Sequence, residues 1–61
     1  MSHYRCYFLG KDYAIQAAED FEAQGDEEAL QRAERLFRDR RGSAGFELWM
    51  GTRRIHRHMA G

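Results

Sequence analysis

The residues whose types best suit metal chemistry lie near the end of the sequence. His56 and His58 are two positions apart, so their imidazoles point to the same side if this segment is a β-strand. Glu47 lies opposite His56 if the flanking segments pair, and two histidines with one carboxylate form a set that binds divalent metals. However, His58 is three residues from the end, and Arg54 and Arg57 would place positive charge near the ion. We therefore expect an exposed histidine pair and no metal.

Cys6 is the only cysteine and the one candidate for a thiol nucleophile. Such a nucleophile needs a base beside it, and His3 or His56 would have to supply one. Cys6 stands in an alternating apolar segment, where a lone cysteine is usually a small core residue. The sequence also lacks a glycine-rich phosphate loop and is too short to build a deep pocket readily. We expect no enzymatic activity, no catalytic residue and no cofactor.

The segment FELWMGTRRIHRH, residues 46–58, joins the only tryptophan to a run of arginine and histidine. In a nucleic-acid-binding protein the arginines would contact phosphates while Trp49 stacked on a base. A formal net charge of zero and a pI near 6.8 weigh against this, because non-specific affinity comes largely from phosphate neutralisation. Charged side chains on an edge strand also block aggregation, which is the simpler interpretation. Nucleic-acid binding through the basic C-terminal hairpin is therefore kept as the alternative hypothesis.

A helix is predicted over DEEALQRAERLFRDRRG, residues 26–42, where apolar residues recur along one helical face. Asp26 is the expected N-cap, and the acidic first turn and basic last turn both suit the helix dipole. Gly42 is expected to end the helix in a left-handed conformation. Charge is uneven along the chain: three basic and eight acidic residues lead up to Glu34, and seven basic and two acidic residues follow it. Much of this asymmetry is ordinary helix chemistry.

Two antiparallel hairpins are predicted, one on either side of the helix. YRCYFL pairs with the segment from Tyr13 to Phe21, and residues 46–50 pair with residues 53–57 around a type II′ turn that begins at Gly51. In the second hairpin the expected facing pairs are Met50 with Arg53, Trp49 with Arg54, Leu48 with Ile55, Glu47 with His56, and Phe46 with Arg57. The result is a single α+β domain, residues 1–61, of ββαββ order. Its four-stranded antiparallel sheet is ordered 2-1-3-4, with one helix packed on one face.

One helix leaves the opposite face of such a sheet uncovered. That face is predicted to carry Trp49, Arg54, His56 and one of Tyr7 or Tyr4, and Tyr7 is taken as the interface candidate. A 61-residue domain buries only about 60% of its unfolded surface, so self-association is the expected source of added stability. We expect a homodimer or another protein partner at this face.

No membrane partner is expected, because nothing approaches the roughly 20 apolar residues of a membrane span. The same absence of a long apolar run argues against a signal peptide. A cytoplasmic location is expected, since a lone thiol stays reduced there.

Three stretches of the chain, YRCYFLG, AAEDFEAQGDEEALQRAERLF and FELWMGTRRIHR, resemble a group of short bacterial proteins of unknown function. These proteins are seen mostly in rhizobia and related alphaproteobacteria. The likeness covers nearly the whole chain and implies a bacterial, cytoplasmic, small α+β domain. It implies no catalytic residue.

Overall fold

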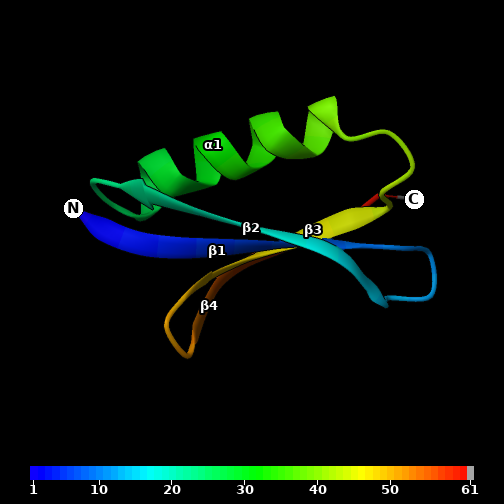
Figure 1. Ribbon diagram of the computed structural model, residues 1–61, viewed down its shortest axis with the longest axis horizontal. Coiled ribbons are helices and arrows are strands. Elements are labelled where there is room, and N and C mark those ends of the chain that lie inside the picture. Colours follow the sequence, from blue (N-terminus) through cyan, green and yellow to red (C-terminus); the bar gives the residue numbers. More distant parts are fainter. Residues whose placement is uncertain (61) are drawn as a thin grey trace.

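The computed structural model describes residues 1–60 and has the predicted α+β fold. Its elements follow in ββαββ order: β1 (Ser2–Leu9), β2 (Ile15–Ala23), α1 (Asp26–Asp39), β3 (Gly45–Met50) and β4 (Arg53–Met59). The strands form one antiparallel sheet in the order β2-β1-β3-β4, and α1 lies along one face of it (Figure 1). The predicted strand order is therefore confirmed.

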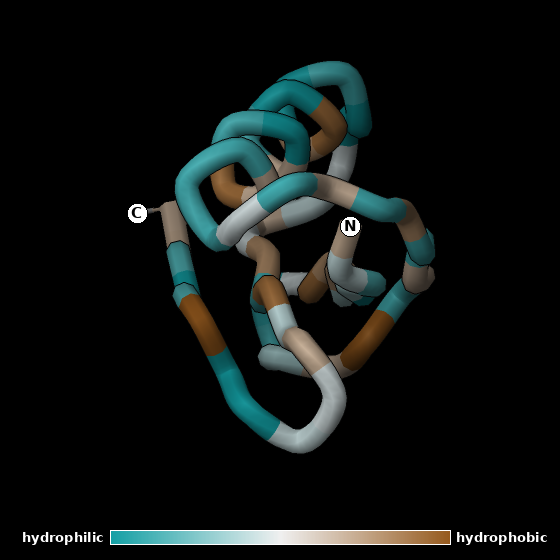
Figure 2. Tube along the Cα trace, turned by 90° about the vertical axis from the view of Figure 1, so that its left-hand side faces the viewer, coloured by the Kyte–Doolittle hydropathy of each residue, from teal (hydrophilic) through white to brown (hydrophobic). Residues whose placement is uncertain are grey.

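The hydrophobic core lies between α1 and the sheet. Alternate residues of β1, namely Tyr4, Cys6 and Phe8, point under the helix and are almost fully buried, because neighbouring side chains of a strand point to opposite faces. Phe46 and Leu48 of β3 continue this layer. On the helix, the buried residues Ala29 and Ala33 are small and allow close approach to the sheet. Seen end-on, the helix lies on one side of the sheet only (Figure 2).

The start of α1 differs from the prediction by one residue. Gly25 is the N-cap, and Asp26 is the first helical residue, so its assignment as the N-cap was wrong. The reason is that the Asp26 carboxylate is engaged with the sheet. It accepts a 2.8 Å hydrogen bond from the Tyr4 hydroxyl and pairs with Arg53 at 3.3 Å. Burial and this carboxylate together raise the pKa of Tyr4.

The end of α1 is stabilised by arginine side chains that cover aromatic rings. The helix ends at Asp39, and Arg40 follows in an extended conformation with its guanidinium 4.8 Å from the centre of the Phe8 ring. About two helical turns earlier in α1, the guanidinium of Arg32 lies in the same way over the ring of Phe21, at 4.9 Å from its centre. Gly42 has the predicted left-handed conformation, with φ +91°, but its predicted role in ending the helix was wrong, because Arg40, two residues earlier, is the C-cap.

The second hairpin contains a β-bulge that the sequence analysis did not predict. Its turn begins at Gly51 with φ +60°, and Trp49 faces Arg54 as expected. Beyond that pair the register shifts, so that Leu48 faces His56 and Ile55 is the extra residue. The three predicted pairs beyond Trp49 were therefore wrong: Glu47 faces Arg57, and Phe46 faces His58.

The bulge has a simple physical reason. It keeps Ile55 against the core while sending Arg57, the next basic residue, to the face away from the helix. With no bulge, Arg57 would face Phe46 on the helix side and would lose its ion pair with Glu47. Within residues 1–60, no helix combines the length and apolar character needed to cross a membrane.

Candidate functional site

The sheet face opposite α1, called the open face below, is ordered into three rows by the pairing of the strands. Each row crosses β2, β1, β3 and β4 in turn. The tryptophan row is Asp20, Arg5, Trp49 and Arg54; the tyrosine row is Ala18, Tyr7, Glu47 and Arg57; the aliphatic row is Ile15, Leu9, Gly45 and Met59.

Three of the four predicted interface residues lie on the open face: Tyr7, Trp49 and Arg54. His56 does not, because the bulge turns it to the helix side, where its ring lies 5.8 Å from that of Phe46. Tyr4, the alternative to Tyr7, is buried beneath the helix. Trp49 is partly buried within the monomer rather than fully exposed.

Glu47 organises the centre of the open face. One carboxylate oxygen accepts a 3.0 Å hydrogen bond from the indole N–H of Trp49. The other lies 3.3 Å from Nε of Arg57 and 3.6 Å from Nη1 of Arg54. The Glu47 side chain is only 17% exposed, so these contacts are partly shielded from water. Both hairpin arginines of this face are therefore held beside a carboxylate.

A second group of charges lies at the β2 border. Arg5 donates two hydrogen bonds to Asp20, at 2.6 and 3.1 Å, and His3 approaches the same carboxylate at 3.6 Å. The guanidinium lowers the pKa of Asp20, and the carboxylate raises the pKa of Arg5. The acidic Glu22, which faces His3, also lies on β2. Acidic side chains thus occupy the β2 border, and arginines occupy the β4 border.

Two shallow hollows border the aromatic residues of this face. One has a volume of about 170 Å³ and lies among His3, Arg5, Tyr7 and Trp49. The other, of about 380 Å³, is lined by Tyr7, Ile15, Glu47, Trp49, Gly51 and Thr52. Because Tyr7 and Trp49 border both hollows, a partner side chain has access to them from two sides. Neither hollow resembles the deep, convergent pocket of an enzyme.

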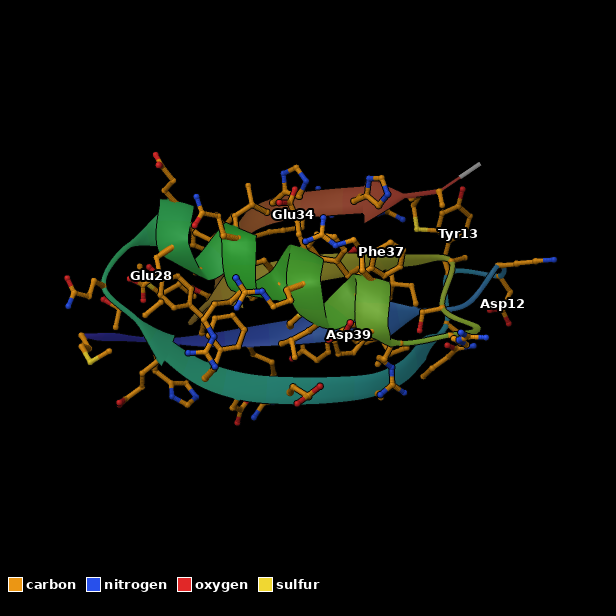
Figure 3. All side chains as sticks on the ribbon, turned by 90° about the horizontal axis from the view of Figure 1, so that it is seen from above. Asp12, Tyr13, Glu28, Glu34, Phe37 and Asp39 are labelled. Atoms are coloured by element: carbon orange, nitrogen blue, oxygen red, sulfur yellow. The ribbon has the colours of Figure 1, made fainter. Side chains whose placement is uncertain are left out.

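Tyr13 in the β1–β2 loop also belongs to this face, and the sequence analysis missed it. Its backbone has φ +67°, an uncommon conformation for a bulky residue, next to an Asx turn in which Asp12 accepts from the N–H of Ala14. The loop brings Tyr13 to the end of β4, where Arg57 lies 5.1 Å from its ring centre (Figure 3). Tyr13 and Ile15 are each 59% exposed. The turn residues Gly10 to Asp12 signal a loop but do not reveal where it folds.

The metal and thiol arrangements considered from the sequence are not assembled. His56 and His58 share the helix side of β4, while Glu47 lies on the open face. In the part of the chain that the structure describes, no three histidine, cysteine or acidic side chains cluster closely enough to hold a metal ion. Cys6 is fully buried, and desolvation, helped by Glu19, raises its pKa to about 12. Such a thiol is a poor nucleophile at neutral pH.

No family model, curated protein or solved structure matches this chain.

Proposed function

We propose that this chain is a small binding module, without enzymatic activity, that associates with a second copy of itself through the open face. The observation that carries the proposal is that the helix covers only one of the two sheet faces. One is covered by α1, while the other presents Trp49, Tyr7, Ile15 and Tyr13 with no element over it (Figure 1). Large aromatic and aliphatic side chains gathered on one face are typical of interaction surfaces.

The size of the face supports a protein partner. The sheet extends along the 31 Å and 17 Å axes of the molecule, while α1 is stacked above it (Figure 1). The projected area is thus roughly 500 Å² before side-chain relief is counted, comparable with the about 800 Å² per partner of a standard interface. An interface of that size would cover about a fifth of the 4218 Å² surface of the chain.

The charge of the face favours a protein over a nucleic acid. Its arginines, Arg5, Arg54 and Arg57, are matched by carboxylates at Asp20, Glu22 and Glu47, and each arginine lies within 4 Å of one of them. The third hairpin arginine, Arg53, pairs with Asp26 on the helix. Nucleic-acid binding through this hairpin therefore has less support, because the neighbouring carboxylates offset the positive charge that would attract phosphates.

The test is the mass of the protein in solution, by light scattering on a sizing column over a dilution series. We expect a wild-type dimer and a weaker dimer for Trp49→Ala, because a central tryptophan commonly carries much of an interface's energy. Arg35→Ala, on the outer side of the helix, is the matched control and should leave the dimer unchanged. Circular dichroism would show that the helix persists in both variants. A monomeric wild-type protein at all concentrations, or an unchanged Trp49→Ala dimer, would refute the proposal.

A further inference from the structure

We infer that the two copies stack open face to open face about a two-fold axis that runs parallel to the strands, between β1 and β3. This inference rests on the proposed self-association and adds its geometry. Most homodimers are two-fold symmetric, so the same patch must complement itself. For two stacked sheets there are two simple choices of axis, parallel to the strands or across them. The residues of the open face distinguish the two.

An axis parallel to the strands places β2 of one copy over β4 of the other. It also keeps each residue at its own level along the strands, so every row stacks on the same row of the second copy in reverse order. Aligned sheets pack at about −30°, which displaces the outer residues by no more than about one position. The complementarity of each row with its own reversal is therefore the decisive property.

The tryptophan row is complementary to its own reversal. Asp20 at the β2 border comes over Arg54 of the second copy, which pairs opposite charges twice in the dimer. Between them, Arg5 comes over Trp49 of the second copy. Arginine over an indole ring is a favourable cation–π arrangement. Within one chain Asp20 already orients Arg5 through two hydrogen bonds, so its guanidinium is held in place before association.

Each of the other two rows contributes one favourable contact. In the tyrosine row, Tyr7 comes over Glu47 of the second copy, where a phenolic hydroxyl is able to donate to the carboxylate. In the aliphatic row, Ile15 on β2 comes over Met59 at the β4 border, beside which Tyr13 lies. Ile15 is one of the most exposed large hydrophobic residues, and this stacking covers it with Met59 of the second copy.

An axis across the strands has the opposite result. It places β2 over β2 and β4 over β4, so the acidic border with Asp20 and Glu22 meets itself and the arginine border meets itself. Like charges brought together at an interface oppose association. The distribution of charge across the open face thus favours the axis parallel to the strands.

The test is a charge-reversal cycle at Asp20 and Arg54, read as the dimer dissociation constant. Asp20→Arg and Arg54→Asp should each raise this constant about tenfold or more, and the double variant should recover part of the affinity, short of wild type because Asp20 also positions Arg5. The two positions lie at opposite edges of the sheet, roughly 14 Å apart within a chain, so recovery in the double variant reports a contact between copies. Thermal melting of each variant controls for folding.

A second measurement does not depend on these charges. Ile15→Cys and Met59→Cys proteins are mixed and treated with a short bismaleimide, which leaves the buried Cys6 unmodified. The mixture should yield a cross-linked heterodimer faster than Ile15→Cys alone yields a homodimer.

The outcomes distinguish the stacking geometry from the proposed self-association on which it rests. If Trp49→Ala weakens the dimer while both charge reversals leave it intact, or if the double variant is no tighter than the single ones, this geometry is wrong and the open face still mediates association. Preferential cross-linking of Ile15→Cys to itself would also overturn the geometry. A wild-type protein that stays monomeric at all concentrations would refute both the stacking geometry and the proposed self-association.

Discussion

The buried thiol of Cys6 should make the stability of this protein fall steeply in alkaline solution. In the folded chain its pKa is raised to about 12, chiefly because burial disfavours the thiolate, against an ordinary value of 9.0. Below pH 8.5 the thiol is protonated in both states, so folding keeps its full stability. Above that pH the unfolded chain loses the proton first, and stability falls as pH rises toward 12. Each pH unit of this interval costs up to about 1.4 kcal/mol, and the loss between pH 9 and pH 10.5 is about 1.6 kcal/mol.

The measurement compares wild type with Cys6→Ala by urea unfolding under reducing conditions and at one protein concentration. The variant loses about 1–2 kcal/mol in the free energy of unfolding at pH 7, because the removed sulfur leaves a small void. This packing contribution does not change with pH. Other groups that titrate in this range, Tyr4 among them, contribute equally to both proteins. The stability of wild type relative to the variant should therefore fall by about 1.6 kcal/mol from pH 9 to pH 10.5, enough to remove most or all of the wild-type advantage. Parallel stability curves over this range would show that the thiol ionises as easily in the folded state, and the reasoning would be refuted.

Two further substitutions test the contacts that hold the helix and the last strand. Tyr4→Phe removes the 2.8 Å hydrogen bond to Asp26 and should cost about 1–2 kcal/mol in the free energy of unfolding, whereas Tyr13→Phe, at an exposed hydroxyl, should cost almost nothing; equal losses would contradict this role for the bond. Gly45→Ala should cost about 1–3 kcal/mol, because the new Cβ would overlap the carbonyl oxygen of His58 and the sulfur of Met59. A melting temperature unchanged by that substitution would mean that β4 moves aside freely.

Local patterns in the sequence were sufficient to predict the elements and their order. The spacing of Ala29, Ala33 and Phe37 indicated a helical face, and Gly51 indicated a tight turn between two strands. Both depend on residues close together in the chain. The order β2-β1-β3-β4 then followed from the need for short connections and antiparallel neighbours.

The positions of His56 and Tyr13 were not predictable in this way, because both depend on contacts between distant segments. The alternation of RRIHRHM fits a strand with or without a bulge, and the two registers differ in whether Arg57 or His56 lies opposite Glu47 of β3. Tyr13 adopts its left-handed conformation in a loop that ends beside Arg57 on β4, more than forty residues later in the chain. Neither contact leaves a signal in the neighbouring sequence.

The bulge at Ile55 connects the fold to the proposed interaction. Because it shifts the register by one residue, Arg57 joins Arg54 beside Glu47, and the three arginines of the open face are each matched by a carboxylate. A regular strand would instead put His56 next to Glu47 and place Arg57 on the helix side of the sheet. The β4 border of the open face would then carry a single arginine, Arg54. The opposition between an acidic β2 border and a basic β4 border would then be weaker. The same backbone irregularity that pairs Arg57 with Glu47 therefore also creates the charge distribution by which two copies would align.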